Sequence, residues 1–225
     1  MSNIKIYHGS KQEVRNPRYG IGKPYNDYGL GFYCTQNIEI AKEWACPDNS
    51  KGFVNEYSID LTKLNVTNLL DNSFNILNWI ALLLKNRSFV PSSSSSQSAK
   101  QFLIENFSPL INNSDIIIGY RADDSYFSFA REFLNSSISL SQLKKAMKLG
   151  SLGEQIVLIS KNAFEKIKFI ESTAVEPSTY HTRRRIRDLN AKIEYYSLRE
   201  EMPQKNEIFM LDLLRGDIEK NDPRI

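Results

Sequence analysis

The chain has 225 residues, of which 41% are hydrophobic and 24% charged, and its formal net charge is +3. This length and composition are typical of one main globular domain and exclude collagen-like, disordered and membrane-spanning classes. The small net charge favours acidic partners only weakly, because clustered charge rather than net charge makes a nucleic-acid surface.

Three sequence features indicate the cellular compartment of the protein. The segment 1–6 lacks the basic, apolar and small-residue sections of a signal peptide, so we expect a cytoplasmic protein. The apolar run 76–84 is about half as long as a membrane helix requires, so no membrane partner is expected. Cys34 and Cys46 form no CxxC pair and have no histidines at ligand spacing. We therefore expect reduced thiols and no bound metal.

Apolar periodicity predicts the elements of the first half of the chain. A strand at 4–7 is expected to end at Gly9 and Ser10, and Thr35 or Asn37 is expected to cap a helix. Repeated Pro and Gly residues predict a long loop over 12–30. The other elements expected here are strands at 32–35 and 53–61, a helix from 38 to 45, a buried helix at 76–84 and a flexible serine-rich loop at 91–98.

The second half is predicted to complete the main domain, at 1–174, and to add a helical extension at 175–225. In the extension, Ile186, Leu189, Ile193 and Tyr196 recur at helical spacing and predict an amphipathic helix. The basic run 183–187 suits nucleic-acid phosphates, although a solvated helix face is the favoured interpretation. The remaining elements expected are strands at 115–119 and 155–159 and helices at 124–134, 140–149, 163–167 and 208–214.

Two short segments carry the candidate chemistry. The first is Tyr7-His8-Gly9-Ser10, beside a strand. The second is Asp27–Thr35, in which Gly29 and Gly31 are separated by one residue and are followed by the apolar Phe32 and by Tyr33, before a strand and a capped helix. By themselves they are compatible with a structural histidine and with a hairpin that buries an aromatic residue. The second segment is not a dinucleotide fingerprint of the Rossmann kind, because the third glycine and the later acidic residue are not in place.

Together the two segments resemble the ADP-ribosyltransferase superfamily, in particular its His-Tyr-Glu branch, which includes poly(ADP-ribose) polymerases and diphtheria-type toxins. The run 7–45, with Gly119–Asp124, resembles a small, largely uncharacterised bacterial family within that branch. The resemblance implies an α+β fold with a split pair of mostly antiparallel sheets and an NAD cleft between them, followed here by the helical extension.

The resemblance also implies a role for each motif residue toward NAD as co-substrate. His8 would hydrogen-bond the adenosine ribose, the Gly9 backbone would hold the nicotinamide carboxamide, and the Tyr33 ring would stack on the nicotinamide. Tyr28 or Tyr25 would supply a second ring. The expected NAD-binding set is His8, Gly9, Ser10, Gly31, Tyr33 and Tyr28.

The third signature position is a glutamate in active members of the branch, and here two residues compete for it. Aligning the apolar strand residues places Gln155 there, whereas Glu154 supplies the carboxylate and would face inward only through a bulge. With His8 and Tyr33 they form the expected catalytic set. Asp123 and Asp124 are expected to hold the acceptor, to replace the missing carboxylate or to cap a helix, with a metal pair the less favoured option.

The activity implied is NAD-dependent mono-ADP-ribosylation of a macromolecular acceptor, protein or nucleic acid, which is a glycosyl transfer. A bacterial toxin of a toxin–antitoxin or phage-defence system, with an antitoxin protein as partner, would fit the family. NAD hydrolysis and a catalytically silent NAD- or peptide-binding module are the alternatives, and Gln155 keeps the last of these open.

Overall fold

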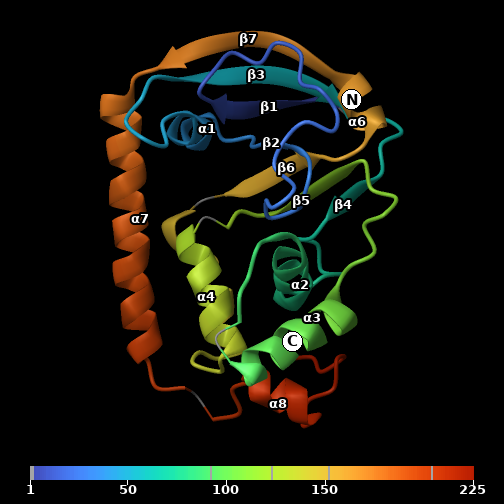
Figure 1. Ribbon diagram of the computed structural model, residues 1–225, viewed down its shortest axis with the longest axis vertical. Helices are drawn as coiled ribbons and strands as arrows, with labels where there is room; N and C mark the ends of the chain where they lie inside the picture. Colours follow the sequence, from blue (N-terminus) through green and yellow to red (C-terminus); the bar gives the residue numbers. More distant parts are fainter. Residues whose placement is uncertain (1–2, 92, 123, 152, 204) are drawn as a thin grey trace.

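The fold is α+β, with two β-sheets and a long C-terminal helix (Figure 1). The computed structural model describes residues 3–91, 93–122, 124–151, 153–203 and 205–225. Within those residues, no helix has both the length and the apolar character needed to cross a bilayer.

The two sheets are mostly antiparallel. The first has three strands in the order β1 (Asn3–Ser10), β3 (Gly52–Asp60) and β7 (Ile167–Val175), all paired antiparallel. The second has the order β2 (Phe32–Cys34), β6 (Glu154–Leu158), β5 (Ile116–Tyr120) and β4 (Val66–Asn68), in which β4 and β5 are parallel. The expected α+β class with mostly antiparallel sheets is therefore confirmed.

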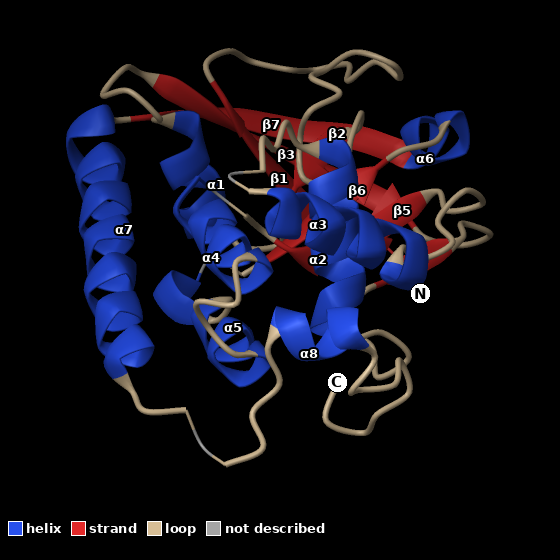
Figure 2. Ribbon diagram, turned by 60° about the horizontal axis from the view of Figure 1, so that its bottom comes forward, coloured by secondary structure: helices blue, strands red, loops and turns tan. Residues whose placement is uncertain are grey.

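Most of the helices gather on one side of the four-stranded sheet (Figure 2). The buried residues of α2 (Ile76–Asn86), including Trp79, pack in one core with Ile117 of β5 and Val157 of β6. That core also takes in the last helix, so the end of the chain packs onto the main domain. The other helices are α1 (Ile38–Ala45), α3 (Ser94–Phe107), α4 (Asp124–Leu134), α5 (Leu140–Ala146), α6 (Lys161–Lys166), α7 (Pro177–Glu200) and α8 (Met210–Arg215).

Among the described residues, a single backbone bridge links the edges of the two sheets, whose inner faces share a hydrophobic core. Tyr7 of β1 and Thr35, just after β2, exchange backbone hydrogen bonds of 2.7 Å and 2.9 Å. Beyond this bridge β1 continues through Gly9 to Ser10 and stays paired with β3, whereas β2, which is antiparallel to β1, pairs with β6. The first strand is longer than the expected 4–7: it includes Gly9 and Ser10, which pair with β3, and it ends at Ser10. The split between β1 and β2 creates room for a site.

Helix α1 lies against the three-stranded sheet through glycines and alanines. The Asn37 side chain caps it by accepting from the amides of Glu39 and Ile40, so Asn37 rather than Thr35 is the cap. A Cβ on Gly9 would lie 2.0 Å from the carbonyl oxygen of Ala41. This contact places α1, and with it Trp44, at the mouth of the split.

The serine-rich segment is not a loop over its whole length, so the predicted flexible loop at 91–98 is wrong for residues 94–98. Helix α3 begins at Ser94, and the Ser93 hydroxyl accepts from the Ser96 amide at 3.1 Å. Serine is favoured at a helix N-cap, and Ala99 and Leu103 bury the helix face that follows. The serine-rich composition therefore gave no indication that a helix begins at Ser94.

Helix α7 has the predicted apolar face, but that face points outward. Ile186, Leu189, Ile193 and Tyr196 are 54–60% exposed. The buried residues lie on the opposite side of the helix, where the Tyr195 ring stacks on Phe129 at a centroid distance of 3.9 Å. The spacing identified the helix correctly and its packing face wrongly, because Ala191, Tyr195 and Leu198, together with ion pairs, hold α7 to the domain.

Candidate functional site

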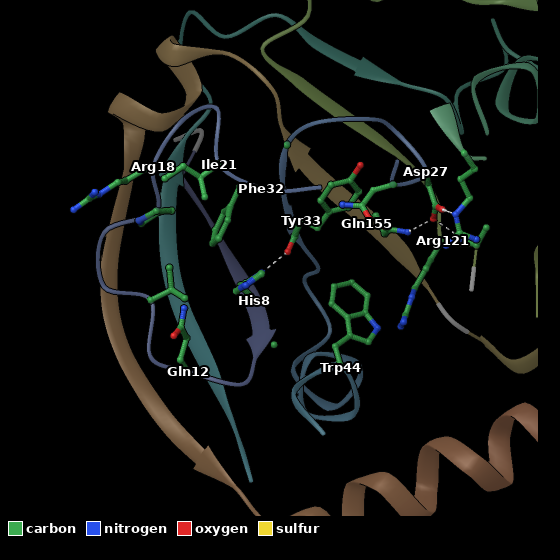
Figure 3. A pocket seen from close by; sticks show the side chains of 18 of the residues that line it. His8, Gln12, Arg18, Ile21, Asp27, Phe32, Tyr33, Trp44, Arg121 and Gln155 are labelled. Atoms are coloured by element: carbon green, nitrogen blue, oxygen red, sulfur yellow. Dashed lines mark hydrogen bonds and ion pairs between the residues drawn. The ribbon is translucent and has the colours of Figure 1, made fainter. Parts of the chain in front are cut away.

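A cavity of about 710 Å³ opens where β1 and β2 diverge. Its walls come from β1, the loop before β2, β2 itself, α1, β6 and the residues that follow β5 (Figure 3). This volume is within the range of small-molecule sites. The fold brings to the cavity the predicted site residues His8, Gly9, Gly31, Tyr33 and Gln155.

His8 is held as a neutral imidazole between the two strands. Its Nδ1 lies 2.7 Å from the carbonyl oxygen of Tyr33. A carbonyl only accepts, so Nδ1 carries the proton and Nε2 is left as an acceptor. Burial lowers the pKa of His8, although the bond to Tyr33 opposes this, and its ring packs 4.4 Å from the Phe32 ring. The side chain bridges the start of the split and can accept from a ligand hydroxyl.

The lowered pKa of His8 predicts a pH-dependent stability. The folded state binds fewer protons at His8 than the unfolded state, whose pKa is about 6.5, so the free energy of unfolding should fall as the pH drops below that value. Urea denaturation at about pH 5 and about pH 7.5 measures this. The loss at low pH should shrink in His8→Asn, which does not titrate, and persist in His181→Asn. An equal pH dependence in His8→Asn would contradict the neutral imidazole assigned to His8.

Tyr33 uses its hydroxyl to hold the loop before β2. The hydroxyl donates to the carbonyl of Gly29 at 2.6 Å and accepts from the amide of Tyr28 at 3.1 Å. Burial is the main reason why the pKa of this phenol is raised. The polar end of Tyr33 is thus committed to the protein, which leaves its ring as the surface available in the cavity.

Two residues of the expected NAD-binding set, Tyr28 and Ser10, are not among the described residues that line the cavity. Tyr28 is buried in the core, where its hydroxyl donates to the carbonyl of Tyr120 at 2.6 Å and accepts from Nε1 of Trp79. The Ser10 hydroxyl donates to the carbonyl of Gln12. The exposed Tyr25 is not among the described lining residues either. Nearness to the motifs in the sequence therefore did not show which side chains reach the cavity.

The competition between Glu154 and Gln155 is decided by the register of β6. The strand pairs with β5 without a shift, Gly119 opposite Gln155 and Tyr120 opposite Glu154. Gln155 is 4% exposed and lines the cavity, whereas Glu154 is exposed. The pairing contains no bulge that would turn Glu154 inward, so the strand register does not bring Glu154 into the cavity.

The carboxylate that does reach the cavity is Asp27, which the sequence did not single out. It accepts hydrogen bonds from Nε2 of Gln155 at 3.0 Å and from the Ala122 amide at 2.9 Å, and Arg87 Nε lies 3.2 Å away. Burial raises its pKa, against the lowering effect of Arg87 and of these hydrogen bonds. An aspartate before a Tyr-Gly turn resembles an ordinary turn residue, so only the fold reveals it.

The paired aspartates can be followed only in part. Asp123 lies outside the described residues, and Asp124 is the first residue of α4, with its side chain outside the description. Their immediate neighbours Arg121 and Ala122 line the cavity. The roles expected for the two aspartates stay predictions.

The cavity lining is electropositive. Among the described lining residues, Asp27 is the single carboxylate, whereas four are arginines. These are Arg18, Arg87, Arg121 and Arg184. Guanidinium groups suit phosphate oxygens, so the site favours an anionic ligand. Within the described residues, no group of three or more His, Cys, Asp or Glu side chains is placed to hold a metal ion.

Comparison with known proteins gives a family. No curated protein and no solved structure matches the chain. Residues 4–169 match the model of a family described as a protein of unknown function, DUF3990. The match covers both sheets except for Asn3 and residues 170–175 of β7, and it ends before α7. The chain therefore belongs to the DUF3990 family.

Proposed function

We propose that the cleft binds NAD and that the protein transfers ADP-ribose from NAD to a macromolecular acceptor. The observation that carries this proposal is the meeting of His8 and Tyr33, from two strands that split at a single bridge, in one electropositive cavity. Their motifs resemble those of the His-Tyr-Glu branch of ADP-ribosyltransferases. A split pair of sheets with the cleft at the split is the arrangement that the resemblance implies.

Each group has a task that suits its chemistry. Nε2 of His8 accepts from a hydroxyl of the adenosine ribose, and the Tyr33 ring stacks on the flat, positively charged nicotinamide. Backbone groups alternate in direction along a strand, so the amide and carbonyl of Gly9 point to the side on which Tyr7 pairs with Thr35. They therefore face the split, where they can hold the carboxamide. The arginines attract the pyrophosphate.

Asp27 and Gln155 form the group that acts on the scissile bond. Because Nε2 of Gln155 donates to Asp27, the amide oxygen is left to accept from a ribose hydroxyl. When the bond to nicotinamide breaks, its electron pair goes to the nicotinamide nitrogen and positive charge develops on the ribose. Asp27, which is held beside Arg87, stabilises that charge from behind Gln155. The acceptor then forms the new bond to the ribose carbon and loses its proton.

The biological setting proposed is that of a bacterial toxin, held in check by an antitoxin protein or deployed against phage. It rests on the resemblance to the toxin-containing branch. An enzyme that consumes cellular NAD or modifies a macromolecule would need such control.

A second candidate function, NAD binding without transfer, is favoured by one observation. Gln155 rather than a glutamate faces the cavity, and an amide cannot act as a base. Incubation with labelled NAD and cell lysate separates the candidates. Labelled macromolecule indicates transfer, free ADP-ribose indicates hydrolysis, and unchanged NAD beside measurable NAD binding rules out both enzymatic functions. Glu154→Ala is the matched control for Gln155→Ala, because Glu154 lies next in the chain and is exposed.

The two parts of the Tyr33 side chain should separate in mutants. Tyr33→Phe removes the bonds to Gly29 and Tyr28 and should lower the free energy of unfolding by about 1–2 kcal/mol, yet it keeps the ring. Tyr33→Leu also removes the ring, so we expect a further loss of NAD affinity of roughly 5-fold or more. Calorimetric titration with NAD, beside thermal unfolding, measures both. Equal NAD affinity in the two variants would argue against stacking.

A further inference from the structure

One end of the cleft is built by three separate elements and carries an aromatic ring between arginines. Trp44 comes from α1, Arg121 follows β5 and Arg184 comes from α7, and all three line the cavity. In Figure 3, Arg121 lies with Asp27 and Gln155 on one side of Tyr33, whereas Arg18 lies on the other side. The arginines of the cleft are therefore divided between its two ends.

Helix α7 is fixed to α1 so that Arg184 reaches this end. Arg183 pairs with Glu39 and Arg187 pairs with Glu43, each at 2.8 Å. The second pair is almost completely buried and adjoins Trp44 in the sequence of α1. The family match ends at residue 169, so Arg184 is an addition to the site from outside the matched region.

NAD has one anionic group, the pyrophosphate between its two riboses. With the adenosine ribose at His8 and the nicotinamide on Tyr33, as proposed above, the pyrophosphate lies on the His8 side, toward Arg18. Trp44 and Arg121 then lie beyond the nicotinamide ribose, on the side of Gln155 (Figure 3), and Arg184 lines the same cavity from α7. This is the side from which an acceptor must approach.

The chemistry of this end fits a nucleotide. The Arg121 guanidinium carbon lies 4.4 Å from the centroid of the Trp44 ring. The indole N–H is buried and has no acceptor among the described residues, so a base or phosphate oxygen would satisfy it. Aromatic rings beside arginines are the usual means of holding single-stranded nucleic acid, because every base has a face to stack and every link carries a charge.

We propose that this end of the cleft binds single-stranded nucleic acid and that the nucleic acid is the acceptor. The identification as acceptor rests on the proposed function. A base stacks at Trp44, while Arg184 and Arg121 hold flanking phosphates. A nitrogen or oxygen of the nucleotide forms the bond to the ribose carbon, the electron pair of the broken bond goes to nicotinamide, and the proton of the nucleophile passes to water.

Binding can be measured without NAD, by fluorescence anisotropy of labelled single-stranded DNA and RNA of about 12 nucleotides. Arg184→Gln should weaken binding several-fold and reduce the slope of log K against log salt by about 0.7. Arg185→Gln is the matched control, because Arg185 is the next residue, is exposed and is not among the described lining residues. Trp44→Ala should weaken binding by roughly 5- to 150-fold, and Trp44→Phe should largely retain it. Circular dichroism verifies that each variant is folded.

The outcomes separate this inference from the proposed function. Equal effects of Arg184→Gln and Arg185→Gln would reduce the site to a generally basic helix and overturn the inference. Loss of NAD affinity in Arg184→Gln with unchanged oligonucleotide binding would assign Arg184 to NAD instead. Labelled ADP-ribose on lysate protein but not on the oligonucleotide overturns the acceptor and leaves transferase activity intact. Absence of NAD turnover, with oligonucleotide binding that depends on Arg184 and Trp44, overturns the transferase and retains the nucleic-acid site.

Discussion

Replacing Asp27 by Asn is expected to lower NAD turnover by at least about 100-fold, the usual cost of removing one preorganised group that stabilises developing charge. Asp27 is the single carboxylate among the described cavity-lining residues, and its bond to Gln155 connects it to the group nearest the proposed ribose site. The NAD dissociation constant should change little, because the charge it stabilises exists only in the transition state. Turnover and calorimetric binding, measured on the same preparation, test both statements.

The Asn variant is preferable to Ala because it is nearly isosteric and keeps an oxygen to accept from the Ala122 amide. It does leave the Arg87 guanidinium without the charge of its partner, so a loss of a few kcal/mol in the free energy of unfolding is expected. Thermal unfolding therefore accompanies the assay, and activity is compared at a temperature where the variant is folded. Glu154→Gln is the control, since it removes an exposed carboxylate that the strand register points away from the cavity.

Full activity in Asp27→Asn, with the fold intact, would contradict the role given to Asp27. The catalytic charge would then have to come from elsewhere, and Asp123 and Asp124 are the acidic residues whose neighbours line the cavity. Asp123→Asn and Asp124→Asn are the variants to compare in that case.

The sequence predicted most elements because their signals are local. Alternation and apolar runs gave the strands β3, β5 and β6, and the nearly all-apolar α2 was correctly expected to be buried. The elements that the sequence did not predict depend on contacts with distant parts of the chain. The short strand β4 is defined by pairing with β5, and the serines before α3 are a helix cap only because a core receives the helix.

The residues of the candidate site also fall into two groups, those that local motifs reveal and those that only the fold brings together. Its motif residues His8 and Tyr33 were found because each lies beside a recognisable strand, and both line the cavity. Asp27, Arg87 and Arg184 are distant in sequence and meet only through the fold. No spacing rule brings residues on a loop, a helix end and an added C-terminal helix to one cavity. Motifs therefore indicated where a ligand lies but not which charges surround it.

Gly9→Ala is expected to be the most destabilising single-methyl change in the cleft, lowering the free energy of unfolding by about 3 kcal/mol or more. The new Cβ would lie 2.0 Å from the Ala41 carbonyl oxygen and 2.7 Å from the Ala45 nitrogen. Both are backbone atoms of α1, so no side-chain rotation relieves the clash and the helix must move. Gly20→Ala is the control: Gly20 has open space around it and a φ of +78°, so its cost is limited to about 1–2 kcal/mol of backbone strain.

The same substitution tests what Gly9 contributes to the site. Its lack of a side chain is required by α1, whereas its backbone faces the split. NAD affinity should therefore fall, because a clash with α1 displaces the Gly9 backbone that is proposed to hold the carboxamide. Adding Ala41→Gly should not restore stability, because the clash is with the carbonyl rather than with the Ala41 methyl, and a glycine inside a helix costs about 1 kcal/mol more. Urea denaturation of the single and double variants measures this. A rescue by Ala41→Gly, or a Gly9→Ala variant more stable than Gly20→Ala, would show that α1 adapts to the extra methyl and that Gly9 serves the ligand directly.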